Sequence, residues 1–262
     1  MPFANSQGVK IYWEEHGAGP PVVFIMGLSF THEMWFRVLP SLTDSYRAIV
    51  FDNRGMGRSD VPRGPYRISQ MAQDTVAVMD AAGVSAAHVV GASMGGMIAQ
   101  ELALRYPRRV LSLLLGCTSY GGFFARWPDF TRRPRNVRWD KSSRSEREAA
   151  LAPLLYADAT PPERIAEDVQ IRCQCTWSYK GFWNQFTGIL LWHSYRRLPR
   201  IRVPTLVVHG DQDRLVPPEN GRVVASRIPQ ARFQLIANAG HILTTDQPEA
   251  CVQTIRQFLA GF

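Results

Sequence analysis

The sequence has little cysteine and no long apolar run. Only four cysteines occur in 262 residues, and they are scattered along the chain. Four such residues do not form the dense disulfide framework of a small secreted domain, and Cys173 and Cys175 have no second pair that would complete a zinc-binding spacing. No stretch approaches the roughly 20 apolar residues that span a bilayer. We therefore expect free thiols and no membrane-spanning helix.

The opening residues also lack the basic segment and following apolar segment of a secretory signal. Together with the sparse cysteines, this favours a cytoplasmic protein. The composition is otherwise that of a folded protein, with 45% hydrophobic and 20% charged residues, and the length is sufficient for a substantial core.

Acidic residues are in the minority. The net charge is +8, and part of the excess lies in residues 126–147, which contain seven arginines and one lysine. No motif that reads nucleic acid accompanies them, so we do not expect a nucleic-acid partner. Two interpretations of this basic stretch stay open, namely a solvated face and a surface that attracts an anionic substrate.

Short apolar runs rich in β-branched residues alternate with helical patterns through most of the chain. Most of the runs are continuously apolar, which is typical of parallel strands buried on both faces. The predicted strands cover residues 8–14, 21–27, 47–52, 87–91, 110–115, 205–210 and 233–236. Helical patterns predict helices over residues 68–82, 94–106, 219–228 and 249–259. The alternation predicts an α/β fold with a mostly parallel central sheet and helices on both faces.

The alternation stops between residues 118 and 200. This segment contains the basic stretch and many aromatic side chains, but no run typical of a buried strand. We expect a helical insertion over 118–200 in a core formed by residues 1–117 and 201–262. Its aromatic side chains are expected to form a mostly apolar pocket wall. The candidate substrate contacts are Trp127, Trp183 and Trp192, and the alternative for each is a place in the core of the insertion.

The segment Gly91-Ala92-Ser93-Met94-Gly95 fits the pattern Gly-x-Ser-x-Gly, between a predicted strand and a predicted helix. In such a turn the serine has a strained backbone, and the residues two before and two after it approach other atoms so closely that glycine is required. The helix N-terminus that follows favours negative charge. Ser93 is therefore the candidate nucleophile.

A serine nucleophile needs a base, and the base needs an acid that orients it. Of the six histidines, His241 lies on a loop after the last predicted β-strand, at the sheet edge where sites of open α/β proteins form. His88 lies within a predicted strand and His209 at the end of one, which favours structural roles. Asp211 and Asp213 both follow a strand end, and the residues alone leave the choice of acid open.

Acyl transfer also needs hydrogen-bond donors for the developing oxyanion. The backbone N–H of Met94 directly follows the candidate nucleophile, and the backbone N–H of Leu28 lies in the loop after strand 21–27. These two groups are the candidate oxyanion hole. Chemistry of this kind requires no metal and no cofactor, and we expect none.

With these parts in place, the sequence resembles the α/β-hydrolase superfamily over nearly its whole length. The matching stretches are Val22–Leu28, Asp52–Ser59, Gly91–Gly95, Gly210–Pro217 and Gly240–His241. The order serine, aspartate, histidine along the chain matches as well.

The resemblance implies roles that the residues alone leave open. It implies that Asp213 is the acid, that Arg54 anchors a loop, and that the insertion is a cap over the site. Relatives often have His-Gly where this chain has Met26-Gly27, a departure that leaves the backbone donor in place.

The sequence is most similar to the branch that contains esterases, enol-lactonases and C–C hydrolases. This resemblance implies a serine hydrolase that cleaves a small-molecule carboxylic ester or lactone through an acyl-enzyme. Two alternatives stay open: a C–C bond hydrolase acting on a diketone-like acid, and a receptor-like protein with very slow turnover. The sequence does not define the acyl group, the alcohol group or the oligomeric state.

Overall fold

The structure, a computed structural model, describes residues 2–122, 125–126, 128 and 142–262. Trp127 lies outside the described residues, and so do Arg132, Arg133, Arg135, Arg138 and Lys141 of the basic stretch.

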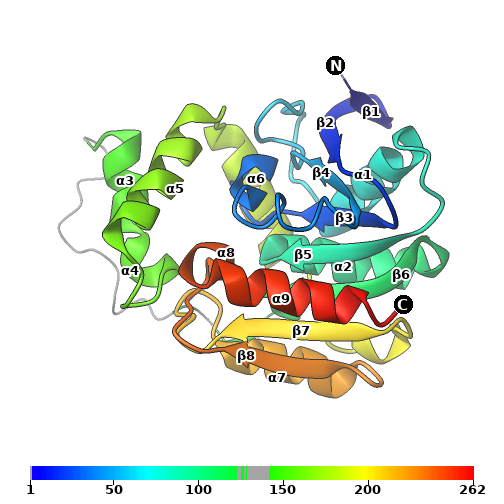
Figure 1. Cartoon of the computed structure of the whole chain (residues 1–262). Coiled ribbons are helices and arrows are strands. Elements are labelled where there is room, and N and C mark those ends of the chain that lie inside the picture. Colours follow the sequence, from blue (N-terminus) through cyan, green and yellow to red (C-terminus); the bar gives the residue numbers. More distant parts are fainter. Residues whose placement is uncertain (1, 123–124, 127, 129–141) are drawn as a thin grey trace.

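An eight-stranded sheet forms the centre of the fold (Figure 1). In spatial order its strands are β1 (Phe3–Ser6), β2 (Val9–His16), β4 (Arg47–Phe51), β3 (Pro21–Ile25), β5 (Ala87–Ala92), β6 (Val110–Gly116), β7 (Thr205–Gly210) and β8 (Arg232–Ile236). The β1–β2 and β2–β4 pairs are antiparallel, and all other neighbours are parallel. The predicted α/β fold is confirmed, and each predicted strand lies within two residues of an observed one. Strand β1 was not predicted.

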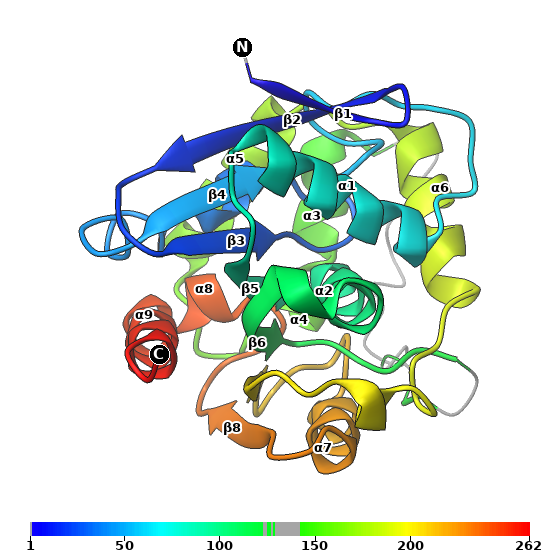
Figure 2. The same ribbon diagram turned by 90° about the vertical axis from the view of Figure 1, so that its right-hand side faces the viewer.

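The central strands β3 to β7 bury side chains on both faces, as their apolar runs predict. Val23 and Ile25 of β3 belong to one apolar cluster, which includes side chains of α1 (Ile68–Ala81), α2 (Met94–Arg105) and α7 (Pro218–Arg227). Val22 and Phe24 belong to the other cluster, beneath α9 (Pro248–Leu259) and the 3₁₀ helix η1 (His32–Trp35). Figure 2 shows α1, α2 and α7 on one side of the sheet and α9 on the other.

The chain leaves the sheet between β6 and β7. Its described helices there are α3 (Arg144–Ala150), α4 (Ala152–Leu155), α5 (Pro162–Gln174) and α6 (Tyr179–Leu190), followed by η4 (Leu198–Arg200). In Figure 1, α3, α4 and α5 gather beyond the carboxyl end of β7. Two further short helices, η2 (Pro107–Arg109) and α8 (Leu243–Asp246), precede β6 and α9. None of the helices within the described ranges has the length and apolar character needed to cross a bilayer.

Helices of this segment begin at residues suited to a helix N-terminus. The Ser143 side chain accepts a hydrogen bond from the Glu146 backbone N–H, and the Glu146 side chain accepts one from the Ser143 N–H, a capping box at the start of α3. The Ser178 hydroxyl accepts the Gly181 N–H at the start of α6. Helix α5 begins at Pro162, where a missing N–H costs nothing.

Candidate active site

Ser93 lies at the turn that joins β5 to α2, with φ of +56° and ψ of −119°. Few residues other than glycine adopt this conformation, because it brings the side chain against the backbone. The Ser93 N–H donates to the Gly116 carbonyl (2.8 Å), and the Ser93 carbonyl accepts from the Thr118 hydroxyl (2.7 Å). These bonds hold the turn in its strained conformation.

Glycine is required two residues before and two residues after Ser93. A Cβ atom at Gly91 would collide with the backbone of Gly95, and a Cβ atom at Gly95 would collide with the carbonyl of Ile25. The close approach that the Gly-x-Ser-x-Gly pattern predicts is therefore present.

His241 and Asp213 lie side by side at the carboxyl ends of the strands. The imidazole Nδ1 is 2.9 Å from Asp213 Oδ2, and both side chains are buried. Asp213 Oδ1 accepts the backbone N–H groups of Leu215 (3.0 Å) and Val216 (2.8 Å), which fixes the carboxylate. Asp211 instead accepts the N–H of Ala239 at 3.2 Å. The structure therefore places Asp213 beside the histidine, and Asp211 ties the neighbouring loop.

The loop that carries His241 is attached to the insertion. The N–H groups of His241 (2.8 Å) and Ile242 (3.0 Å) both donate to the carbonyl of Leu155, at the end of α4. The preceding Gly240 donates its N–H to Asp246 Oδ2 at 2.6 Å. Backbone atoms of the insertion thus help to position the imidazole, a role that no sequence pattern indicated.

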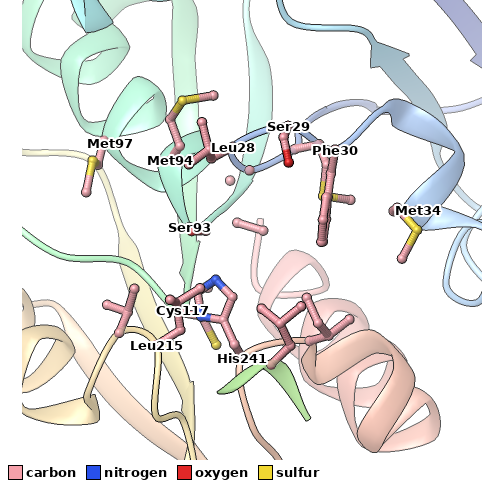
Figure 3. A pocket seen from close by; sticks show the side chains of 18 of the residues that line it. Leu28, Ser29, Phe30, Met34, Ser93, Met94, Met97, Cys117, Leu215 and His241 are labelled. Atoms are coloured by element: carbon pink, nitrogen blue, oxygen red, sulfur yellow. The ribbon is translucent and has the colours of Figure 1, made fainter. Parts of the chain in front are cut away.

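Ser93 and His241 border the same cavity, which has a volume of about 1140 Å³. In Figure 3 the imidazole points toward Ser93, and Leu28 and Met94 lie on the other side of the serine. Most of the residues that line the cavity are apolar, and Phe30 is one of them. The Ser93 hydroxyl makes no hydrogen bond to the imidazole within the described structure, so proton transfer requires a small approach of the two groups.

The two candidate oxyanion donors also border this cavity. In the described part of the chain, the N–H groups of Leu28 and Met94 donate no hydrogen bond. The next residue, Ser29, has a positive φ of 63° and donates its N–H to Gln185 Oε1 at 3.0 Å. Gln185 Nε2 donates in turn to the Arg54 carbonyl at 2.8 Å. A side chain of α6 thus holds the loop that carries Leu28, and sequence reasoning missed it.

The three predicted tryptophan contacts differ in their positions. Trp183 lines the cavity and is 45% exposed. Trp192 is buried in the core, does not line the cavity, and donates its indole N–H to Glu101 at 2.8 Å. This position favours the core alternative for Trp192 over a contact with the substrate. Trp127 lies outside the described residues.

The other predicted structural residues occupy buried positions. Arg54 forms two hydrogen bonds of 2.6 Å with Asp74 of α1, which suits a loop anchor. His88 Nδ1 pairs with the Ser112 hydroxyl at 2.8 Å. His209 is fully buried, and neither of its ring nitrogens has a hydrogen-bond partner among the residues described.

The cavity wall carries more positive than negative charge. Apart from His241, its described residues that carry a formal charge at neutral pH are one acid and four bases: Glu148, Arg126, Arg144, Arg147 and Arg172. Arg144 donates to the carbonyls of Cys173 (3.4 Å) and Cys175 (2.7 Å) at the end of α5. The described members of the basic stretch that border the cavity are therefore not a purely solvated face.

Two described clusters bring three possible metal ligands together. In the first, burial and the neighbouring Asp213 raise the pKa of the Cys117 thiol well above its usual value, which leaves a neutral thiol beside His241. A neutral thiol is a weak ligand, and Asp213 already has three hydrogen-bond partners, namely Leu215, Val216 and His241. The second cluster consists of His32, Glu33 and Asp52, and it does not line the cavity. Neither donor set is well suited to a metal at the candidate site.

Comparison with known proteins establishes the family. The sequence profile of the α/β-hydrolase fold matches residues 20–248. The chain belongs to this family. It is 35% identical, over 100% of this chain and 98% of the other, to a protein of Azorhizobium caulinodans named "Putative carbamate hydrolase RutD".

Solved structures of the family are similar over almost the whole chain. The enol-lactonase from Burkholderia xenovorans LB400 is 26% identical, with a TM-score of 0.86 over 99% of this chain and 100% of that one. A thermophilic esterase from Thermogutta terrifontis is 29% identical, with a TM-score of 0.84 over 99% of this chain and 97% of that one. The chain is therefore a hydrolase of this family, as the resemblance predicted.

Proposed function

We propose that this hydrolase cleaves a carboxylic ester or lactone through an acyl-enzyme, with Ser93 as nucleophile, His241 as base and Asp213 as the acid that orients it. The observation that carries the proposal is the hydrogen bond between Asp213 and His241 at the edge of a cavity that Ser93 also borders. The strained turn at Ser93 supports it, because such turns expose a nucleophile at the N-terminus of a helix.

In the proposed mechanism, the Ser93 hydroxyl attacks the substrate carbonyl and His241 takes its proton. The N–H groups of Leu28 and Met94 stabilise the oxyanion. His241 then donates the proton to the departing alkoxide, which leaves an acyl-enzyme. A water molecule, deprotonated by His241, attacks the acyl carbonyl, and the acid departs as Ser93 recovers its proton. Asp213 holds the imidazole in one tautomer and stabilises its charged form.

We further propose that residues 118–200 act as a cap over this site, on a core formed by residues 1–117 and 201–262. Two contacts support a cap that also positions the site, namely those of Leu155 with His241 and of Gln185 with Ser29. The mechanism needs neither metal nor cofactor, and the cytoplasmic location stays a prediction.

The proposal is tested by hydrolysis of short and medium 4-nitrophenyl esters. We expect turnover by the wild type, and a fall of several orders of magnitude in kcat for Ser93→Ala, as removal of a nucleophile causes in triad enzymes. Ser226→Ala, at an exposed serine of α7, is the matched control and should retain activity. Turnover that survives Ser93→Ala would show that another group is the nucleophile.

Carbamate hydrolysis is a second candidate, favoured by the 35% identity to the RutD protein. A carbamate carbonyl would be attacked by Ser93 in the same way, so 4-nitrophenyl carbamates belong in the same assay. The C–C hydrolase alternative predicts weak turnover of all simple neutral esters. The receptor-like alternative predicts that ligands raise Tm while turnover stays negligible.

A further inference from the structure

A buried arginine lines the candidate active-site cavity. Arg172 lines the cavity from α5 and is only 3% exposed. Burial of a guanidinium is costly unless its N–H groups are paired. Nε and Nη1 of Arg172 nevertheless have no hydrogen-bond partner in the described structure.

The contacts of Arg172 leave part of its hydrogen-bonding capacity unused. Its Nη2 forms an ion pair with Glu148, the only acid among the described lining residues. Arg144 and Arg147 border the same cavity, so the described charged residues around this ion pair carry a positive excess. An anion that entered the cavity would gain N–H donors that Glu148 does not use.

Arg172 lies near the loop that carries the candidate oxyanion donor. The guanidinium lies 4.5 Å from the centroid of the Phe30 ring. Phe30 follows the candidate oxyanion donor Leu28 by two residues, a separation of at most ~7 Å along the chain. Arg172 is therefore on the same side of the cavity as this loop, and its described side-chain contacts include neither Ser93 nor His241. It would bind a group of the substrate other than the scissile carbonyl.

Helix α5 is held firmly enough to place this charge. Asp168, one turn before Arg172, accepts hydrogen bonds from the hydroxyls of Tyr156 (2.9 Å) and Thr245 (2.6 Å). Arg144 also binds the carbonyls at the C-terminal end of α5. A guanidinium on a fixed helix needs little reorganisation when it binds a ligand.

We propose that the substrate carries a carboxylate remote from its scissile carbonyl and that Arg172 binds this carboxylate. The inference rests on the proposed ester or lactone hydrolysis and specifies its substrate class. Glu148 shares the guanidinium with this carboxylate through Nη2, and Nε and Nη1 are the donors that the ligand uses.

The test compares anionic esters with neutral esters of the same shape. One pair places the carboxylate on the acyl side: the 4-nitrophenyl half-ester of adipic acid and its methyl ester. A second pair places it on the alcohol side: 4-acetoxyphenylacetic acid and its methyl ester. We expect kcat/KM of the wild type to be at least about 10-fold higher for the anionic member of one pair, the gain from one charge-assisted hydrogen bond.

Arg172→Met should abolish this preference and leave kcat/KM for the neutral member within about 3-fold of the wild type. Arg172→Lys retains the charge but not the planar fork, and it should retain part of the preference. Arg108→Met is the control for net charge, because Arg108 is exposed on η2, away from the cavity. This control substitution should leave kcat/KM unchanged for both the anionic and the neutral ester.

Two outcomes would overturn the inference while the proposed function stands. The first is Ser93-dependent hydrolysis without an anionic preference in either pair. The second is an equal loss of kcat/KM for the anionic and the neutral ester in Arg172→Met, which would make Arg172 a structural residue. A binding measurement is independent of turnover: adipate should raise the Tm of Ser93→Ala and fail to raise that of Ser93→Ala with Arg172→Met. Failure of ester hydrolysis with retention of this shift would reject the proposed function alone.

Discussion

At the scale of single residues, the buried histidines His209 and His241 lie near each other, and their different partners give them different properties. His241 has Asp213 at 2.9 Å, whereas His209, at the end of β7, packs against the ring of Phe233 with a centroid distance of 6.2 Å. Burial lowers the pKa of His209 to about 4. The ring is therefore neutral under ordinary conditions, and its role is to fill space.

His209 should make stability depend on pH. In the unfolded chain it binds a proton below pH ~6.5, whereas the folded protein resists protonation until about pH 4. Because the unfolded state binds more protons in this window, the free energy of unfolding falls as pH falls from 6.5 to 4, by about 3 kcal/mol from this group. His209→Leu removes the group, so the free energy of unfolding of this variant should fall less between pH 6.5 and pH 4 than that of the wild type.

Urea unfolding at a series of pH values measures this difference. Other groups titrate in both proteins and cancel when the two curves are subtracted. Parallel curves for the wild type and His209→Leu would mean that His209 binds its proton equally in the folded and unfolded states.

The sequence identified single residues where one local rule was sufficient. Ser93 was predicted from glycine spacing and a strand-to-helix turn, and the structure has that turn. The choice between Asp211 and Asp213 needed the resemblance, because two aspartates two residues apart satisfy the same local rule. Arg172 was missed, although it follows Ile165 and Asp168 at helical spacing and so lies on the face of α5 that packs inward.

At the scale of elements, helix α6 is linked to the oxyanion loop through a single side chain. Gln185 is fully buried and bonds both Ser29 N–H and the Arg54 carbonyl. The Ser29 bond spans 156 residues of sequence. Its effect is to fix the backbone beside Leu28, whose N–H is the proposed oxyanion donor.

Removal of this side chain should affect the transition state more than substrate binding. In Gln185→Ala the Ser29 N–H loses its partner and the loop can shift the Leu28 donor. We expect kcat to fall by about 10-fold with little change in KM, because an oxyanion donor acts mainly in the transition state. Steady-state kinetics on a neutral 4-nitrophenyl ester gives both constants.

Gln174→Ala is the matched control, since Gln174 is exposed at the end of α5. It should leave kcat and KM unchanged. A rise in KM with constant kcat in Gln185→Ala would instead indicate that α6 shapes the pocket without positioning the donor.

A helix or strand could be predicted when its pattern lies within one short stretch of the sequence. The buried strands β3 to β7 show as apolar runs and were found, as was the more exposed β8, whereas β1 has four residues of alternating burial and no such run. The short helices η1 and α8 have too few turns to produce a period. The contacts of Leu155 and Gln185 join distant parts of the chain, and no local pattern encodes them.

At the scale of the whole molecule, the net charge has the same sign as the described charge of the candidate active-site cavity. The chain carries a net charge of +8, and four of the five described charged residues in the cavity wall are arginines. A field of this sign raises the local concentration of anions and their rate of association. This long-range effect is distinct from the short-range contact proposed for Arg172, since ions in solution screen the first far more than the second.

Salt should therefore separate the two effects. As KCl rises from 20 to 500 mM, we expect kcat/KM for the anionic adipate half-ester to fall by about 10-fold, because the Debye length shrinks from about 20 Å to about 4 Å. Its neutral methyl ester should change by less than about 2-fold. Arg172→Met should lower kcat/KM for the anionic ester at every salt concentration while its dependence on salt stays close to that of the wild type. A flat response of the wild type would mean that the positive field does not reach the substrate, and a flat response of Arg172→Met alone would mean that Arg172 itself is the source of that field.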